Sequence, residues 1–304
     1  MQHWRSETDS DGIVWLRLDK ADASANVLST DVMGELNTLV DGLQGKVPRG
    51  VVIFSGKQSG FVMGADINEF TSIDTPERAY EVTRLGQQLF DKIEALSCPT
   101  VAAINGFAMG GGLELVMSLD YRLALASKKR ILGLPEVKLG LHPGFGGTVR
   151  SVALVGVFAA MDMMLTGRNI RPKQARSMGL VDQVVPARHL ERAARTLALE
   201  PPVRKGQSLR ERALNSPAGR PAVAAILEKQ VAKKARREHY PAPYAIIDLW
   251  RAYGDRPEPP RPIADRPPDE EKLAAARRYL GDRERVLAAG PYTLYTDSRD
   301  DVLL

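Results

Sequence analysis

Three consecutive glycines stand directly before an acidic residue in the stretch NGFAMGGGLELVMSLD, residues 105–120. A helix that begins near Gly111 presents unpaired backbone N–H groups at its first turn, with the positive end of the helix dipole behind them. Because glycine has no Cβ, a ligand oxygen can approach this backbone closely, as in a main-chain oxyanion site. Glu114 lies one turn into the helix and can face the same ligand. The same glycines also suit close packing of a helix on a strand, and the stretch alone does not separate the two interpretations.

Further residues that can do chemistry stand beside glycine or proline in three other stretches. These are GADI at 64–67, PEVKLG at 135–140 with Glu136, and HPGFGG at 142–147 with His142. Each has a plainer interpretation when taken alone: a tight turn, an exposed loop carboxylate and a loop histidine. The glycines at 144–147 do not form a phosphate loop of known spacing, since no Lys-Ser/Thr follows them. The case for a site therefore depends on all these stretches acting together.

The predicted elements that position these stretches alternate between strand and helix along the chain. Apolar runs bounded by turn residues predict strands at 12–18, 50–54, 100–104, 120–126 and 130–133. Apolar residues at helical spacing predict helices at 32–43, where residues 30–31 can cap, at 75–96 and at 113–118. This alternation indicates an α/β core whose strands pair mainly in parallel. Beyond residue 147 the pattern is largely helical, at 148–155, 159–165, 172–178 and 187–199, with one short strand at 181–185.

The chain beyond residue 200 differs in composition from the part before it. Ten Lys/Arg and only three Asp/Glu fall between residues 203 and 240, which predicts a basic helical extension over 201–254. We interpret these charges as a solvated helix face, because no aromatic side chain is interleaved with them before Tyr240. Six of the fourteen residues at 255–268 are proline, which is typical of an extended linker. We therefore expect residues 255–304 to form a Pro-rich linker and a charged, poorly ordered tail.

Composition narrows the class of protein. A chain of 304 residues with 44% hydrophobic residues is long enough to bury a full core. Cys98 is the only cysteine, so no internal disulfide can form and a reducing compartment is expected. The first residues lack the apolar run of a signal peptide, and no stretch has the roughly 20 apolar residues of a membrane span. We expect a cytoplasmic protein without a membrane span and without a nucleic-acid partner.

Taken in order, these motifs resemble those of the crotonase family of enoyl-CoA hydratases and isomerases. The matching stretches are GADI (64–67), NGFAMGGGLEL (105–115), PEVKLGLHPGFGGT (135–148), LTG (165–167) and GLVDQVVP (179–186). The resemblance covers about residues 12–200 and implies an α/β fold of the ClpP/crotonase type. In that fold a spiral of ββα units is followed by a helical C-terminal region, which makes 1–200 the catalytic core. HYPAPYAIIDLW (239–250) is further similar to the end of the hydratase half of bacterial multifunctional fatty-acid-oxidation α subunits.

Carried over by position, the resemblance implies a role for each motif. The backbone N–H groups of Ala65 and Gly111 form the oxyanion hole. Glu114 and Glu136 are the two catalytic carboxylates, with Glu114 orienting a water and Glu136 supplying the proton at C2. The CoA thioester lies against residues near the GADI turn and the glycine run, namely Gly64, Asp66, Ile67, Gly110 and Lys57. Of these, Lys57 is a candidate for a CoA phosphate, with a solvated lysine as the alternative.

The implied reaction is hydration of 2-enoyl-CoA thioesters in fatty-acid β-oxidation, by a homo-trimer or hexamer that has other β-oxidation enzymes as candidate partners. The paired Glu residues favour hydration over Δ3–Δ2 enoyl-CoA isomerisation, which uses the same oxyanion hole. A non-catalytic acyl-CoA-binding subunit is the alternative outside enzymes. No metal and no cofactor are expected. We predict no NAD chemistry, because no GxGxxG follows a strand downstream and roughly 50 residues beyond Tyr253 are too few for a Rossmann domain.

Overall fold

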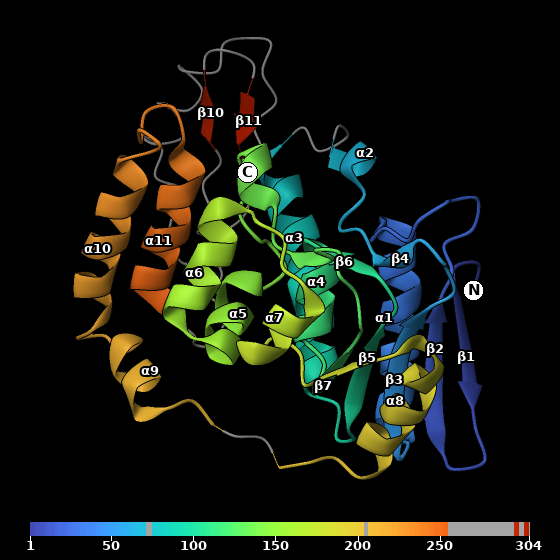
Figure 1. Ribbon diagram of the computed structural model, residues 1–304. Coiled ribbons are helices and arrows are strands. Elements are labelled where there is room, and N and C mark those ends of the chain that lie inside the picture. Colours follow the sequence, from blue (N-terminus) through green and yellow to red (C-terminus); the bar gives the residue numbers. More distant parts are fainter. Residues whose placement is uncertain (71–74, 204–205, 255–294, 298–300, 304) are drawn as a thin grey trace.

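The computed structural model describes residues 1–70, 75–203, 206–254, 295–297 and 301–303. Figure 1 shows one group of strands on the side of the N-terminus, with helices both beside these strands and across the rest of the molecule. The larger sheet has the strand order β1-β2-β3-β5-β7-β9. Its strands are β1 (Trp4–Thr8), β2 (Ile13–Leu18), β3 (Gly50–Ser55), β5 (Thr100–Ile104), β7 (Tyr121–Leu125) and β9 (Gln183–Val185). β1 and β2 are antiparallel, and every following neighbour pair is parallel, as predicted.

A second sheet contains three short parallel strands in the order β4-β6-β8. They are β4 (Gly60–Val62), β6 (Phe107–Met109) and β8 (Leu132–Gly133). Along the chain β3 is followed by β4, β5 by β6 and β7 by β8, and a helix or 3-10 turn follows each pair. Every ββα unit thus gives one strand to each sheet, which confirms the predicted spiral. The sequence analysis missed β1, β4 and β6, because three-residue strands are too short to show alternation and only Trp4 of β1 is buried.

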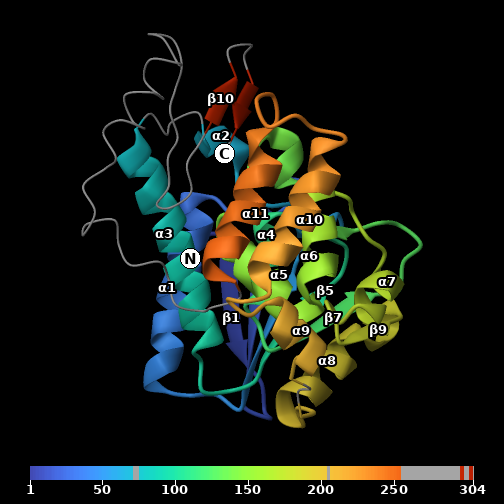
Figure 2. The same cartoon turned by 90° about the vertical axis from the view of Figure 1, so that its left-hand side faces the viewer.

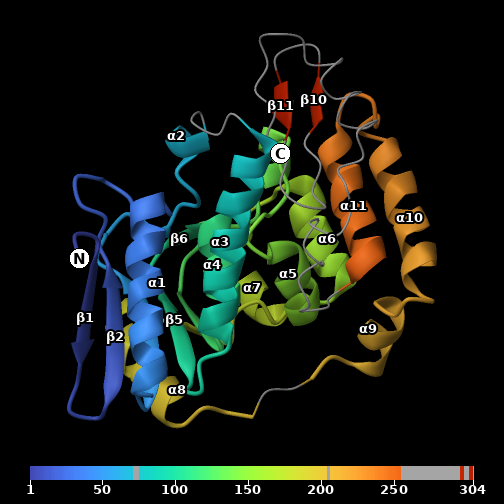
Figure 3. The same cartoon turned by 180° about the vertical axis from the view of Figure 1, so that it is seen from behind.

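Alternate side chains of the larger sheet enter two separate cores, as the two-residue period of a strand requires. From β3, Val51 and Ile53 join the core formed with α1 (Thr30–Gly45) and α3 (Pro76–Glu94), while Val52 joins the core formed with α8 (Leu190–Leu199). Figure 3 shows α1 and α3 side by side in front of the strands, and Figure 1 shows α8 on the opposite face. The N-cap of α1 is Ser29, one residue before the predicted capping residues 30–31, so the helix begins two residues earlier than predicted.

Helices form the other half of the molecule. They are α2 (Ile67–Phe70), α4 (Gly111–Met117), α5 (Gly147–Val155), α6 (Val157–Thr166), α7 (Pro172–Ser177), α9 (Leu209–Leu214), α10 (Arg220–Ala232) and α11 (Pro241–Tyr253), with 3-10 turns η1 (Glu136–Leu139) and η2 (Ala187–His189). α10 packs beside α11, and α11 contacts α5 and α6 (Figure 2). The buried Trp250 of α11 donates its indole N–H to Oδ1 of Asn215 at 2.8 Å. None of the described helices has the length and apolar character needed to cross a bilayer.

The basic segment at 201–254 presents most of its described charges to solvent. Lys229, Lys233 and Arg236 are exposed, whereas Arg220 is buried. This is the arrangement expected of a solvated helix face. The division into a core and an extension at residue 200 remains a proposal. Of the tail predicted for 255–304, the structure describes only the antiparallel pair β10 (Tyr295–Asp297) and β11 (Asp301–Leu303), and the Pro-rich linker lies outside the described residues.

Candidate active site

Three segments of the predicted site leave neighbouring strands of the smaller sheet. Because β4, β6 and β8 are parallel and paired, their carboxyl ends lie at the same edge. Gly64 and Ala65 follow β4, Gly110 and Gly111 follow β6, and Glu136 follows β8. The sheet therefore brings together motifs that lie far apart in the sequence.

The distances between these segments are short. A β-carbon on Gly64 would lie 4.0 Å from the amide nitrogen of Gly111, and one on Gly110 would lie 3.0 Å from Oε1 of Glu136. Both glycines have positive φ, +117° at Gly64 and +50° at Gly110, a region that other residues rarely adopt. The GADI turn, the glycine run and Glu136 thus lie close together in the structure.

The amides of Ala65 and Gly111, the proposed oxyanion donors, are not used by the backbone of the described residues. Leu28 forms a parallel bridge with Ala65, in which its N–H donates to the carbonyl of Gly64 at 2.8 Å and its carbonyl accepts from the amide of Asp66 at 3.1 Å. The bridge uses the residues on either side of Ala65, so the amide of Ala65 points away from Leu28. Gly111 opens α4, where the first amides have no acceptor within the helix. Within the described ranges, neither amide donates a hydrogen bond to another backbone group.

The glycine run packs closely against its neighbours, one of the two purposes that the sequence left open. A β-carbon at Gly112 would lie 2.4 Å from the carbonyl oxygen of Val62, so this position allows α4 to pack closely on β4. A β-carbon at Gly111 would lie 3.2 Å from the ring of Phe145 and 3.4 Å from a methyl of Leu28. Close packing therefore explains Gly112 and also leaves little room for a side chain at Gly111, whose amide stays a proposed oxyanion donor.

Glu114 is held by the loop that precedes α5. Its residue is 2% exposed, and its Oε1 accepts hydrogen bonds from the amides of Phe145 at 2.8 Å and Gly147 at 2.7 Å. A β-carbon at residue 147 would lie 2.8 Å from the same oxygen, so Gly147 leaves room for the carboxylate. Hydrogen bonds from backbone amides stabilise the ionised form of a carboxyl group. The loop therefore favours Glu114 as a carboxylate.

Glu136 has a different environment. It opens η1, and both of its carboxyl oxygens are buried without a hydrogen-bond partner among the described residues. A buried carboxyl group without partners is costly to ionise. Such an unsatisfied group in a folded protein calls for an explanation, and a role in proton transfer to a bound ligand supplies one.

The two carboxyl groups titrate together. Burial raises the pKa of Glu114 to about 7, while its backbone hydrogen bonds and the charge of Arg150 act in the opposite direction. Burial, and then the charge of Glu114, raises the pKa of Glu136 well above its usual range. Because two carboxylates repel each other, the pair loses its two protons in separate steps. Between the two steps, one carboxyl group is ionised and the other stays protonated. The surroundings favour Glu136 as the residue that carries this proton.

His142 lies in the loop before α5, as expected for a loop histidine. Its Nδ1 is 3.2 Å from the carbonyl oxygen of Pro143, and burial lowers its pKa to about 4. The imidazole is therefore neutral at pH 7 and adds no charge to the site. Among the residues that the structure describes, no group of three or more His, Cys, Asp and Glu side chains is arranged to hold a metal ion.

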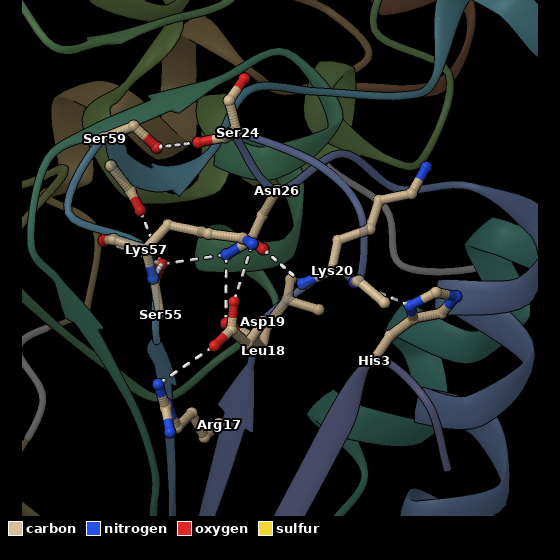
Figure 4. Close-up of polar contacts among 12 residues, drawn as sticks. His3, Arg17, Leu18, Asp19, Lys20, Ser24, Asn26, Ser55, Lys57 and Ser59 are labelled. Atoms are coloured by element: carbon tan, nitrogen blue, oxygen red, sulfur yellow. Dashed lines mark hydrogen bonds and ion pairs between the residues drawn. The ribbon is translucent and has the colours of Figure 1, made fainter.

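Two charged residues near the predicted CoA site are paired within the protein. The Nζ atom of Lys57 lies 2.8 Å from a carboxylate oxygen of Asp19 (Figure 4). The Nζ atom of Lys20 lies 2.9 Å from a carboxylate oxygen of Asp66. These pairs lower the pKa of both Asp19 and Asp66, with the hydrogen bond from the lysine as the first cause. Ile67, at the start of α2, is 63% exposed. The assignment of these residues to CoA binding stays a prediction, and a CoA phosphate would compete with Asp19 for Lys57.

Asn26 is a residue that the sequence analysis missed. It is 1% exposed, and its side-chain amide donates to Ser55 Oγ and to the carbonyls of Leu18 and Phe61 (Figure 4). Its own carbonyl accepts from the amide of Met63 at 2.9 Å, directly before the GADI turn. An asparagine in a turn-rich stretch commonly binds backbone groups, but the sequence does not reveal which ones. Asn26 ties β2, β3 and β4 together beside the proposed oxyanion site.

Comparison with known proteins supports the predicted family. The family model described as enoyl-CoA hydratase/isomerase matches residues 8–233. Among curated relatives, the fatty acid oxidation complex subunit alpha of Shewanella halifaxensis is 42% identical over 246 residues, which cover 79% of this chain and 35% of the relative. The protein of the same name from Shewanella loihica is 43% identical over 245 residues, with the same coverage. The chain thus spans about a third of the length of these relatives.

Solved structures show the same fold. A crystal structure of an enoyl-CoA hydratase from Bacillus anthracis matches with a TM-score of 0.60 and 28% identity, covering 82% of this chain and 89% of the other. Pseudomonas aeruginosa DspI matches with a TM-score of 0.61 and 27% identity, covering 78% and 90%. The family predicted from the motifs is confirmed: the chain belongs to the enoyl-CoA hydratase/isomerase family.

Proposed function

We propose that this enzyme is a 2-enoyl-CoA hydratase, which adds water across the C2=C3 double bond of 2-enoyl-CoA thioesters in fatty-acid β-oxidation. The observation that carries the proposal is the unequal pair of buried carboxyl groups beside two amides that have no backbone acceptor among the described residues. Glu114 is stabilised as a carboxylate by two amides, and Glu136 has no hydrogen-bond partner in the described part of the chain. Hydration needs one base and one acid at neighbouring carbons, and this pair supplies both.

The first step is addition of water to C3. The amides of Ala65 and Gly111 bind the thioester oxygen and stabilise the negative charge that develops on it. Loss of one such donor typically raises the barrier by about 2.7–4 kcal/mol. Glu114 accepts a proton from the water as its oxygen bonds to C3, and the C2=C3 electron pair moves toward the thioester carbonyl to give an enolate.

The second step is protonation of C2. Glu136 donates its proton to C2, which collapses the enolate to the 3-hydroxyacyl thioester. One proton has then moved from water to Glu114 and another from Glu136 to C2. Glu114 must therefore lose a proton to solvent and Glu136 must take one up before the next turnover. No electrons leave the substrate, and the reaction therefore needs no NAD.

The proposal is tested by mixing the purified chain with crotonyl-CoA and longer 2-enoyl-CoA thioesters and following the loss of enoyl absorbance. We expect turnover, and a chain-length series measures the preference for acyl length. A parallel assay with a 3-enoyl-CoA separates hydration from isomerisation. Tight acyl-CoA binding without turnover of either substrate would instead favour a non-catalytic binding subunit.

The place in β-oxidation is supported by the curated relatives, whose name refers to a fatty acid oxidation complex. We further propose a cytoplasmic homo-trimer or hexamer, with other β-oxidation enzymes as candidate partners. Light scattering on the eluting peak of a sizing column measures this oligomeric state, and a monomer would contradict it.

A further inference from the structure

The loop that binds Glu114 is itself held by one arginine. Arg150 lies in α5, and only 9% of its side chain is exposed. Its Nη1 donates to the carbonyl oxygen of Phe145 at 3.0 Å, and the amide of Phe145 donates to Glu114 at 2.8 Å. Arg150 and Glu114 therefore bind the same loop residue, Arg150 at its backbone carbonyl and Glu114 at its backbone amide.

Arg150 is in turn fastened to helix α3. Its Nη2 lies 2.5 Å from Oδ1 of Asp91, and its Nε lies 3.0 Å from Oε2 of Glu94. The side chains of these two acids are 46% and 53% exposed, so they face solvent on one side and the guanidinium on the other. Gln87 of the same helix donates to the carbonyl of Gly144 at 2.8 Å. Helix α3 thus binds two successive loop carbonyls, one directly and one through Arg150.

The ring of Phe145 makes the same connection by apolar contact. It lies edge-on to Phe90 of α3, with ring centroids 5.7 Å apart. A β-carbon on Gly86 of α3 would lie 2.5 Å from the ring, and one on Gly111 would lie 3.2 Å from it. The ring fills the space between α3 and the glycine run, so a shift of the loop also disturbs the proposed oxyanion site.

We propose that Arg150 is a positioning residue for hydration, which keeps Glu114 placed and ionised through the Phe145 carbonyl and through its charge, without touching the substrate. This inference rests on the proposed function. The charged groups around Glu114 are Glu136 from η1 and Arg150 from α5, with Asp91 and Glu94 of α3 behind the guanidinium. Arg150 is the cation among them, and it lowers the Glu114 pKa against the effect of burial.

The test compares three variants by the pH dependence of kcat/KM for crotonyl-CoA. Arg150→Met removes both charge and hydrogen bonds. We expect the acid limb of its profile to move up by about one pH unit and kcat to fall about tenfold or more. Arg150→Lys keeps the charge without the planar fork, so its acid limb stays near that of the wild type while kcat still falls.

Arg195→Met is the matched control. Arg195 also pairs with two acids, Asp9 and Asp11, and lies over the ring of Trp15, and none of these residues belongs to the site. We expect this control to keep the wild-type pH profile and kcat.

A third variant predicts a shift of the opposite sign. Glu94→Gln keeps a hydrogen-bond acceptor for Arg150 but removes a negative charge, so the acid limb moves down, on the order of half a pH unit. The side chain of Glu94 is half exposed, so we expect this variant to fold. It therefore still tests the inference if Arg150→Met does not fold. The inference is overturned if Arg150→Met behaves like Arg195→Met, or if Glu94→Gln moves the limb upward. A wild-type chain that hydrates no 2-enoyl-CoA defeats the proposed function itself and is recognised before any variant is compared.

Discussion

Glu114 and Glu136 are the same residue type in one buried site, yet the segments that carry them differ. Glu114 stands on the regular helix α4 and receives two amides from the loop before α5. Glu136 opens a 3-10 turn after β8 and has no hydrogen-bond partner in the described part of the chain. The contrast teaches that the backbone donors around a carboxyl group, and not the residue type, would separate the proposed base from the proposed acid.

The largest expected effect comes from removing either carboxyl group. Glu114→Gln and Glu136→Gln should each lower kcat for hydration by about 10²–10⁴-fold, because each removes one partner in proton transfer. Exchange of the C2 proton of butanoyl-CoA in D2O distinguishes them. We expect it to persist in Glu114→Gln and to be lost in Glu136→Gln, since only Glu136 is assigned to C2. Equal exchange in both variants would erase the proposed division of roles.

Gly111→Val tests the proposed oxyanion site beside the two carboxyl groups. Its side chain would meet Phe145 and Leu28 and displace the Gly111 amide. We expect kcat to fall by about 10²–10³-fold, as for loss of one oxyanion donor, with weaker acyl-CoA binding as well. Steady-state kinetics and calorimetric binding of butanoyl-CoA measure the two effects, and a variant with wild-type kcat would show that this amide does not contact the thioester.

The pH dependence of kcat/KM follows from the contrast in pKa. Activity requires Glu114 ionised, so it falls as pH drops through the raised pKa of Glu114, about 7. Activity also requires Glu136 protonated, and it falls again at higher pH as Glu136 ionises. We expect a bell-shaped profile whose two limbs belong to the coupled pair. An acid limb at the ordinary pKa of Glu, near 4.5, would contradict the effect of burial on Glu114.

The smallest effect concerns stability. Folding raises the Glu136 pKa above its ordinary value of 4.5, so the contribution of this group to stability is fully present below that pH and is lost as pH rises toward the folded pKa. Glu136→Gln has no group that ionises here, so it avoids this loss and should have a higher melting temperature than the wild type at pH 8. Each kcal/mol of difference in unfolding free energy should shift the melting temperature by about 2–4 °C. Thermal unfolding at pH 8 and pH 4 measures the difference, which should vanish at pH 4. A lower melting temperature for the variant at pH 8 would mean that the carboxylate is stabilised in the fold.

Much of the architecture was predictable, because long apolar runs carry a clear period. The strands that became β2, β3, β5 and β7 and the helices α1 and α3 were predicted within a few residues. β4 and β6 were not, although their ends carry the proposed oxyanion amides, because three residues cannot show a period. Asn26 and Arg150 have roles that depend on partners from distant segments, so their type and position in the sequence do not predict them.

The sequence by itself determined the family, the alternation of strands and helices in the α/β core and the residue types of the site, because local motifs and the period of apolar residues carry this information. Only the tertiary structure decided which amides lack a backbone acceptor among the described residues, how closely each glycine packs, and which carboxyl group receives hydrogen-bond donors. The physical reason is that hydrogen bonds and burial at this site join the ends of parallel strands with loops remote in sequence, and their geometry exists only once the sheet has formed.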